Sequence, residues 1–331
     1  MIKKFKSPYA AIALFSGGLD SILAVKWMQK AGYRIYPLCF LTPYMPIERA
    51  IESARANDID LVVRDISVEH LEMMQEPGTI FGKNMNPCID CHALMIRIAG
   101  NMLKELDAHY IVTGEVLGQR PMSQRKDAMN RVAKLSGYRD LIVRPLSQKL
   151  LRDTKPIIEN WIDRNDMLDF SGRGRYRQLE LAKELQILEY PAPAGGCLLT
   201  DKNYSLRLKD LMQHNQLDTL NMALLKYGRH FRIDAKTKLI IGRDENENDK
   251  LEELGAKIYL KAKEYTGPLG IVSTTKLDAS ILDTVLGIFW YYHPKAPKSG
   301  TVIMNNYKQI YEYACQKIDY ESARKFRISF D

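Results

Sequence analysis

The sequence predicts an α/β fold with a doubly wound, mostly parallel sheet, followed by a second, smaller α+β domain. Continuous apolar runs without alternation, such as residues 10–15, are typical of strands buried on both faces of a parallel sheet. These runs alternate with segments of helical periodicity over roughly the first 145 residues, which indicates βαβ units. The chain has 331 residues, and a domain usually holds about 100–200, so two domains are expected, 1–200 and 201–331.

Strands and helices alternate in chain order through the first domain. We expect strands at 10–15, 34–41, 60–65, 110–113 and 141–143, and helices at 21–29, 46–57, 68–75 and 91–106. The pattern weakens after residue 151, where 171–177 and 191–197 are expected to be loops. The second domain is expected to hold a helix at 207–225 and short strands at 231–233, 239–241 and 258–260. Doubly wound sheets bind ligands at the carboxyl ends of their strands, so functional residues are expected there.

The composition is that of an ordinary globular chain, with 46% apolar and 27% charged residues. Five cysteines are too few for a disulfide scaffold. No run of 18 apolar residues is present, and the first apolar run is broken at Ser16, so neither a transmembrane helix nor a signal peptide is expected. We therefore expect a cytoplasmic protein without a membrane partner.

The positive charge is concentrated in one stretch of the chain. The formal net charge is +8, and residues 120–177 alone hold fourteen basic and seven acidic side chains. Such clustering is typical of a nucleic-acid-binding surface, although a solvated basic face would show the same count. Arg173, Arg175 and Arg177, with Tyr176 between them, add phosphate donors and a stacking ring on a glycine-rich loop.

A glycine loop directly follows the first strand and opens the first helix. It reads Ser16-Gly17-Gly18-Leu19-Asp20-Ser21. Glycines let the backbone approach a phosphate, and the serines and the helix N-terminus add donors. Asp20 is explained if it holds Mg²⁺ bound to a pyrophosphate group, whereas the plain alternative is a βα turn with an acidic first turn. The loop lacks the lysine of a Walker A motif.

This hexapeptide resembles the PP-loop of the ATP pyrophosphatase superfamily, whose sheet is of the adenine nucleotide alpha hydrolase-like kind. The resemblance implies that the chain binds ATP and Mg²⁺, adenylates an oxygen of its substrate, releases pyrophosphate and lets a nucleophile displace AMP. It does not choose the substrate. Two other classes therefore stay open: an amide-forming ligase acting on a small molecule, and a non-catalytic RNA-binding protein that keeps an ATP fold.

Three of the cysteines form a second candidate site. Cys88 and Cys91 make a Cys-x-x-Cys at an expected helix start, and Cys197 follows a Gly-Gly pair. Three thiolates can hold a [4Fe–4S] cluster with one open iron. Zn²⁺ held with His92, a persulfide relay between two cysteines, or no metal at all are the alternatives. The remaining two, Cys39 and Cys315, are expected in the core.

The cysteine spacing resembles that of the tRNA 2-thiouridylases, in which an Asn-Pro motif leads to a helix-start cysteine and a second cysteine follows about a hundred residues later. Cys91 and Cys197 match these positions, which implies a catalytic role for both. Cys88 departs from that pattern, and the trio is more similar to the iron–sulfur-dependent tRNA thiolation enzymes. The resemblance thus favours a cluster held by Cys88, Cys91 and Cys197.

The loops after the fourth and fifth strands carry the same resemblance. Residues 113–119, Thr-Gly-Glu-Val-Leu-Gly-Gln, are similar to a Thr-Gly-Glu segment of the tRNA 4-thiouridine synthetases. Gly114 is expected to let the chain pass close to the nucleotide. Arg144, which ends the fifth strand, is expected either to clamp a phosphate or to sit in a solvated ion pair.

The second domain resembles a different family. Residues 227–233 and 241–248 are similar to the NFACT-R RNA-binding module. This resemblance implies RNA contacts by Arg229, His230, Arg232 and Arg243, whereas the plain alternative leaves them on the surface of a small α+β domain.

Together these features predict an ATP-dependent tRNA sulfurtransferase that converts a uridine carbonyl to a thiocarbonyl. The expected catalytic residues are Asp20, Cys91 and Cys197, and the expected nucleotide contacts are Ser16, Gly17, Gly18, Asp20, Ser21, Gly114 and Arg144. The expected partners are tRNA, a sulfur donor such as sulfide, a cysteine desulfurase or a sulfur carrier, and a second copy of the chain in a homodimer.

Overall fold

The chain divides into two compact units, Met1–Gly196 and Cys197–Asp331. The structure is a computed structural model that describes residues 5–45, 47–187, 189–192, 197–255, 258–274, 277–306 and 308–329. Pro46 of the second expected helix and residues 193–196 of the expected loop before Cys197 lie outside these ranges. The division falls four residues before the boundary expected from the sequence.

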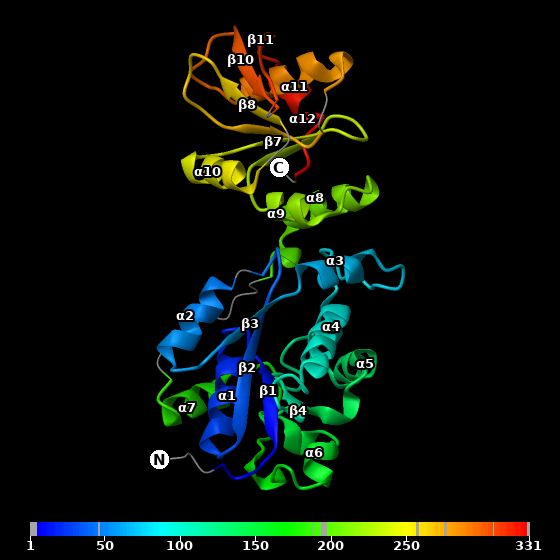
Figure 1. The fold of residues 1–331 in the computed structure, drawn as a ribbon, viewed down its shortest axis with the longest axis vertical. Coiled ribbons are helices and arrows are strands. Elements are labelled where there is room, and N and C mark those ends of the chain that lie inside the picture. Colours follow the sequence, from blue (N-terminus) through cyan, green and yellow to red (C-terminus); the bar gives the residue numbers. More distant parts are fainter. Residues whose placement is uncertain are drawn as a thin grey trace. The chain divides into compact units, whose positions relative to one another are not determined.

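The first unit is built on a five-stranded parallel sheet in the order β3-β2-β1-β4-β5 (Figure 1). Its strands are β1 (Ala10–Leu14), β2 (Arg34–Leu41), β3 (Val62–Asp65), β4 (Tyr110–Val112) and β5 (Ile142–Val143). In the central strand β1, Ala11 pairs with Ile35 on one side and Tyr110 on the other. The doubly wound parallel sheet predicted from the sequence is confirmed.

Seven α-helices of the described chain accompany this sheet. They are α1 (Leu19–Lys30), α2 (Glu48–Ala56), α3 (Ser67–Gln75), α4 (Cys88–Asn101), α5 (Lys126–Ser136), α6 (Lys155–Ile158) and α7 (Tyr176–Glu184), with short 3₁₀ turns η1 (Arg139–Leu141), η2 (Gln148–Leu150) and η3 (Arg164–Asp166). The predicted apolar stripe of α1, formed by Ile22, Val25 and Met28, is fully buried. The small alanines of β1 are buried as well, which allows the helix to pack closely.

Three helices of this unit, α5, α6 and α7, are not predicted from the sequence. The helix α6 is a single turn of four residues with Pro156 near its start. The helix α5 buries Ala128, Met129 and Val132 and ends at Gly137, whose φ of 79° allows a left-handed cap. The helix α7 begins inside the segment expected to be a loop, because that loop ends at Arg175. Residues 171–177 hold three arginines and two glycines and no apolar residue of helical spacing, so the sequence does not predict a helix start there.

The order of the strands creates a topological switch point at the carboxyl end of β1. The chain runs from β1 through β2 to β3 on one side and then crosses to β4 on the other side. Neighbouring loops that lead away in opposite directions leave space for a ligand between them. The glycine loop follows β1 and residues 113–119 follow β4, so both predicted nucleotide segments border this switch point.

The second unit contains a six-stranded antiparallel sheet in the order β11-β10-β8-β9-β7-β6. Its strands are β6 (Arg229–Arg232), β7 (Lys238–Ile241), β8 (Ile258–Ala262), β9 (Gly270–Val272), β10 (Ser299–Asn305) and β11 (Ile310–Gln316). Its helices are η4 (Leu198–Thr200), α8 (Lys202–Gln213), α9 (Thr219–Leu224), α10 (Glu245–Leu254), α11 (Ala279–Tyr291) and α12 (Tyr320–Arg324). The α+β class expected for this unit is confirmed.

The single helix expected at 207–225 is two helices, because Asp218 starts a new one. Its carboxylate accepts a hydrogen bond from the Asn221 backbone N–H and caps α9. The core of the unit forms where α11 buries Phe289 and Trp290 together with Phe231. Among the described helices of the whole chain, none is long and apolar enough to span a bilayer.

Candidate functional site

The glycine loop is shaped by its own side chains and by close packing. Gly17 has a φ of +74°, and a Cβ there would lie 2.6 Å from the Ala50 Cα, so only glycine fits. Gly18 caps α1, and the Ser21 hydroxyl donates to its carbonyl at 2.8 Å. The Ser21 Oγ also lies 3.4 Å from the Ser16 Oγ. These contacts hold the loop in the compact form expected of a phosphate-binding turn.

The loop after β4 packs directly against the start of α1. A Cβ on Gly114 would lie 2.7 Å from the Asp20 carbonyl oxygen and 2.8 Å from the Ser21 Cα. The sequence suggested that Gly114 allows approach to the nucleotide. The structure gives it a different reason, because the close neighbour is the backbone of α1. The consequence is that residues 113–119 and the glycine loop form one continuous surface.

Asp20 is the most unusual carboxylate of this surface. Its Oδ2 accepts a hydrogen bond of 2.6 Å from the Gln119 amide, and the Gln119 carbonyl accepts one of 2.8 Å from Gln178. Its Oδ1 is buried without a hydrogen-bond partner. Burial raises the pKa of Asp20, while Gln119, Arg175 and Arg120 oppose this rise. A carboxylate oxygen with no donor is what a hard cation requires, so the residues present fit Mg²⁺.

Glu115 lies in a buried ionic cluster beside this loop. Its Oε2 accepts from the Arg144 Nε at 2.8 Å and from the Thr113 hydroxyl at 3.0 Å, and the His92 Nδ1 lies 3.5 Å from its Oε1. Burial alone would raise the pKa of Glu115, but Arg144 and His92 hold it at about 2. The cluster thus keeps Glu115 ionised and ties the helix that carries His92 to the loop after β4.

Arg144 has one further feature relevant to phosphate binding. The structure pairs its Nε with Glu115, in agreement with the ion-pair alternative, but places this pair in the interior rather than in solvent. Its Nη2 is buried and has no hydrogen-bond partner. A fixed guanidinium with one unshared donor suits an anionic group, so the phosphate role predicted for Arg144 also stays open.

Cys88 and Cys91 occupy the first turn of α4, as predicted. Cys88 is the first helical residue, and its sulfur lies 3.1 Å from the Asn86 side-chain nitrogen. Cys197 precedes η4 and belongs to the second unit. Within the described ranges, no three His, Cys, Asp or Glu side chains come together in a way that could hold a metal ion. The described residues therefore do not present an assembled cluster or zinc site.

The other two cysteines are core residues, as predicted. Cys39 in β2 and Cys315 in β11 are both buried. Burial raises the pKa of each thiol to about 11. Neutral thiols of this kind pack as small apolar groups and are poor nucleophiles.

The basic segment 171–177 ends in the first turn of α7, and its side chains have different surroundings. The Arg177 Nη2 lies 2.5 Å from an Asp169 oxygen, and its guanidinium covers the Phe170 ring at 4.4 Å. Arg175 has a buried Nε without a partner, and its charge acts on Asp20. Arg173 and Tyr176 are exposed. The sequence assigned Arg175 to RNA binding, whereas its position favours the nucleotide site.

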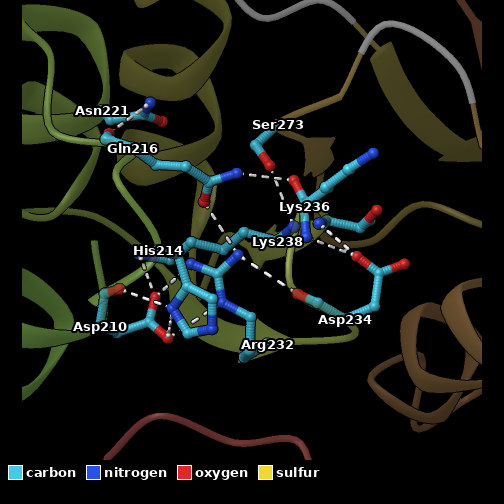
Figure 2. Close-up of polar contacts among 10 residues, drawn as sticks. Asp210, His214, Gln216, Asn221, Arg232, Asp234, Lys236, Lys238 and Ser273 are labelled. Carbon is cyan, nitrogen blue, oxygen red and sulfur yellow. Dashed lines mark hydrogen bonds and ion pairs between the residues drawn. The ribbon is translucent and has the colours of Figure 1, made fainter. Parts of the chain in front are cut away.

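The arginines expected to contact RNA in the second unit are held by neighbouring groups. Figure 2 shows Arg232 facing Asp210, with Nε–Oδ1 and Nη2–Oδ2 distances of 3.0 and 2.5 Å. Its side chain is only 13% exposed. His230 is buried, and its Nε2–H donates to the Tyr227 carbonyl at 2.7 Å. Arg232 and His230 are therefore placed in the interior, where they stabilise the fold.

The remaining two arginines keep part of their surface in solvent. The Arg243 Nε lies 2.9 Å from a Glu247 oxygen, yet half of its side chain is exposed. The Arg229 guanidinium covers the Tyr292 ring at 4.9 Å and donates to the Gly242 carbonyl. These two residues are better placed than Arg232 for a contact with RNA.

A buried lysine makes the stability of the second unit depend on pH. Burial lowers the pKa of Lys238 to about 7, and its Nζ lies 3.7 Å from Asp210 (Figure 2). An unfolded lysine titrates near about 10.4, so between these values the unfolded chain binds more protons. We expect the unfolding free energy of this unit to rise with pH from about 7 to 10, by at most about 1.4 kcal/mol per pH unit.

Hydrogen exchange of peptides from the second unit, measured on the full chain across this pH range, tests the expectation after correction for the intrinsic exchange rate. Lys238→Met should flatten the dependence. The exposed neighbour Lys236 provides the matched control, since Lys236→Met should leave the slope unchanged. An equal slope in wild type and Lys238→Met would contradict the assignment.

Two sequence families match the two units. Residues 228–327 match the family described as "NFACT protein RNA binding domain". Residues 7–161 match the family "Thiamine biosynthesis protein (ThiI)". This match lies within the first unit. The ThiI match includes the glycine loop, the Cys-x-x-Cys and the Thr-Gly-Glu segment, so the resemblances found in the sequence are confirmed for both units.

Curated relatives of the chain come from archaea and bacteria. The chain is 28% identical over 145 residues to an uncharacterised protein of Methanocaldococcus jannaschii, a match that covers 42% of this chain and 50% of that protein. It is 31% identical over 145 residues to a "Probable tRNA sulfurtransferase" of Thermococcus kodakarensis, covering 40% and 36%. The chain thus spans half or less of the length of these relatives.

A solved structure described as a 4-thiouridine synthetase–RNA complex with bound ATP is also similar. It aligns with 19% identity over 54% of this chain and 52% of that chain, with a TM-score of 0.36.

Proposed function

We propose that the chain is an ATP-dependent tRNA sulfurtransferase that adenylates a uridine carbonyl oxygen and replaces it with sulfur. One observation carries the proposal: the nucleotide loop and the cysteine-bearing helix meet on the same loop after β4. Gly114 of that loop packs on Asp20, and Glu115 faces His92, the neighbour of Cys91. The ThiI match and the relatives named tRNA sulfurtransferase support the same reaction.

Several residues of the chain are suited to hold the triphosphate of ATP. The backbone of the Ser16–Ser21 loop and the N-terminus of α1 offer donors to phosphate. Arg144 offers its unshared Nη2, and Glu115 fixes the orientation of that guanidinium. Asp20 would hold Mg²⁺ through Oδ1, and the ion, when bound, would neutralise phosphate charge as pyrophosphate leaves. The target uridine must be unstacked so that its carbonyl can reach the α-phosphate.

We assign the sulfur chemistry to Cys91 and Cys197, with sulfide, a cysteine desulfurase or a sulfur carrier as the source. A [4Fe–4S] cluster held by Cys88, Cys91 and Cys197 is part of the proposal, and the position of Cys88 and Cys91 in one helical turn supports it. tRNA is the proposed partner, with Arg173, Arg229 and Arg243 as exposed or half-exposed contacts, and a homodimer is the proposed assembly.

The proposal is tested by mass spectrometry of tRNA nucleosides from a strain that lacks the gene. A missing thiouridine that returns with the wild-type gene would support it and identify the product. An unchanged nucleoside profile, together with no tRNA-dependent release of pyrophosphate from ATP by the purified chain, would overturn it. Pyrophosphate release that requires a small-molecule acceptor instead of tRNA would favour the ligase alternative.

The cysteine trio gives a separate prediction. Cys88→Ala and Cys197→Ala should each lose bound iron after anaerobic reconstitution with iron and sulfide, since a cluster needs three thiolates. Thiolation should fall at least about 100-fold, whereas the pyrophosphate release step should stay within about threefold, because Asp20 and its loop are unchanged. Iron content and visible absorbance are the readouts. Cys315→Ala, which removes a buried core thiol, is the control and should keep its iron. Full iron binding in Cys88→Ala would exclude the three-cysteine site.

A further inference from the structure

Two glutamines from different parts of the chain form a line of hydrogen bonds that ends at Asp20. Gln119, in the loop after β4, donates from its Nε2 to the Asp20 Oδ2 at 2.6 Å. Gln178, in the first turn of α7, donates from its Nε2 to the Gln119 Oε1 at 2.8 Å. Gln178 is 2% exposed, although α7 as a whole lies at the surface with most of its other residues in contact with solvent. A polar side chain buried in this way needs a reason.

The chemistry of the three groups gives this line of hydrogen bonds a single direction. An ionised carboxylate can only accept hydrogen bonds, so the amide NH2 group of Gln119 must face Asp20. The Gln119 carbonyl is then turned away from Asp20 and requires a donor. The amide NH2 group of Gln178 is that donor. Each amide therefore fixes the orientation of the next, and Gln178 determines which end of Gln119 the carboxylate meets.

The line of hydrogen bonds leaves the two oxygens of Asp20 in different states. Oδ2 is occupied by Gln119, whereas Oδ1 is buried and has no hydrogen-bond partner. The charged groups that act on this carboxylate are Arg175, at the start of α7, and Arg120, directly after Gln119. Both favour the ionised form, and burial opposes it. The arrangement presents one oriented carboxylate oxygen beside the glycine loop.

We propose that Gln178 is a positioning residue which, through Gln119, orients Asp20 so that its Oδ1 takes the divalent cation of a bound nucleoside triphosphate. The inference rests on the nucleotide site of the proposed function, but not on tRNA or on sulfur transfer. It assigns a role in the nucleotide site to α7, which lies beyond the residues that match the ThiI family.

Reversing the polarity of Gln178 tests the proposal. In Gln178→Glu the introduced carboxylate, when ionised, can only accept hydrogen bonds. It therefore competes with Asp20 for the single amide NH2 group of Gln119. We expect the Mg²⁺ affinity of the variant, measured by titration calorimetry with a non-hydrolysable ATP analogue at about pH 8, to fall at least about 10-fold relative to wild type. At about pH 5.5 the Mg²⁺ affinity of Gln178→Glu should return toward that of wild type. The introduced carboxyl regains a donor once it is protonated, and its position near Asp20 favours protonation.

Two further variants separate positioning from packing. Gln178→Leu removes the donor without adding an acceptor, and we expect a smaller loss, about threefold, that does not change with pH. Gln186→Glu makes the same chemical change at an exposed site just after α7 and should match wild type. A Gln178→Glu variant that is folded by circular dichroism and binds Mg²⁺ like wild type at about pH 8 would overturn the proposal, as would a loss that acid does not reverse.

The wild-type titration distinguishes this failure from that of the proposed function. If the wild-type chain binds the Mg²⁺–analogue pair and Gln178→Glu binds it equally well, only the role of Gln178 is wrong. If the wild-type chain binds no nucleotide, the site at Asp20 fails, and the role of Gln178 falls with it. A chain that binds the nucleotide but thiolates no tRNA would overturn the proposed reaction and leave the role of Gln178 supported by its own variants.

Discussion

Asp20→Ala is expected to lower tRNA-dependent pyrophosphate release at least about 100-fold. A cation at a leaving pyrophosphate supplies several kcal/mol of transition-state stabilisation, and each 1.36 kcal/mol corresponds to about tenfold in rate. Asp20 is the described carboxylate at the glycine loop whose Oδ1 is buried without a partner, so no neighbouring acid of that loop can replace it. The measurement is a coupled pyrophosphate assay with saturating ATP and tRNA.

Removing only the charge of Asp20, as Asp20→Asn does, should not destabilise the protein. Burial raises the pKa of Asp20, so the folded chain binds more protons than the unfolded chain in the range between the two pKa values. Stability then falls as the pH rises through that range, and at neutral pH the ionised Asp20 is unfavourable for folding. Asp20→Asn should therefore have a melting temperature equal to or above that of wild type while it loses activity.

A matched control separates this effect from the loss of any acidic residue. Asp60 is exposed in the same unit, and Asp60→Ala should keep both the rate and the melting temperature. An Asp20→Asn variant with a clearly lower melting temperature would show that Asp20 stabilises the fold, and its loss of activity would then say little about metal binding.

The location of the site follows from the sequence because its parts are local. The alanine-rich run of β1 identifies a doubly buried strand, and the hexapeptide from Ser16 to Ser21 identifies the turn after it. Parallel strands end at one edge of the sheet, so the loops after β1 and β4 had to meet. The parallel pairing of β1 with β4, in which Ala11 lies opposite Tyr110, brings these two loops together.

The partners of the site residues do not follow from the sequence, since they depend on distant segments. Gln178 lies 59 positions from Gln119, directly after a stretch expected to be a loop, and its role exists only once α7 has packed. The same holds for Arg232, whose partner Asp210 is 22 positions away on a different element. A charged residue in a motif shows which chemistry is available, but its exposure depends on where its counterion lies.

The strands β9, β10 and β11 of the second unit are not predicted from the sequence, and the edge strand β11 shows one physical reason. β11 forms an edge of its sheet and exposes Ile310, Tyr311 and Glu312, so it has no clear alternation of apolar and polar residues. Its partner β10 starts with the exposed Ser299. Edge strands are stabilised by pairing with a neighbour more than by burial of one face, and pairing leaves little trace in a single sequence.

The largest stability effect is expected for Asp210→Ala. Asp210 lies on α8 and pairs with Arg232 of β6 and, at 3.7 Å, with Lys238 of β7 (Figure 2). It thereby joins the first long helix of the second unit to two neighbouring strands. Removing the carboxylate leaves the Arg232 guanidinium, 13% exposed, without its counterion. It also removes the counterion of Lys238, 2% exposed, whose amine is protonated below about pH 7. Breaking a buried ion pair on one side usually destabilises by about 3–5 kcal/mol, and we expect a loss of this size.

The measurement is native-state hydrogen exchange on the full chain, with peptides of the first unit as an internal reference. Exchange of β6 and β7 should accelerate strongly in Asp210→Ala, whereas exchange of β1 and β4 should not change, because the two units have separate cores. Asp249→Ala, at an exposed position of α10, is the control for loss of an acidic side chain. Equal protection of β6 in wild type and Asp210→Ala would contradict the prediction.

A double variant decides whether the effect comes from uncompensated charge. Below about pH 7, where the Lys238 amine is protonated, adding Lys238→Met to Asp210→Ala removes a cation left without a partner and replaces it with an apolar side chain of similar length. If stranded charge dominates, the double variant should recover part of the lost stability, since an apolar replacement in the interior is often neutral or favourable. If the carboxylate acts mainly through its hydrogen bonds to Arg232, the double variant should remain as unstable as Asp210→Ala, because those bonds at 3.0 and 2.5 Å are absent in both. The sign of this coupling therefore separates a charge effect from a hydrogen-bond effect at the junction of α8 with the sheet.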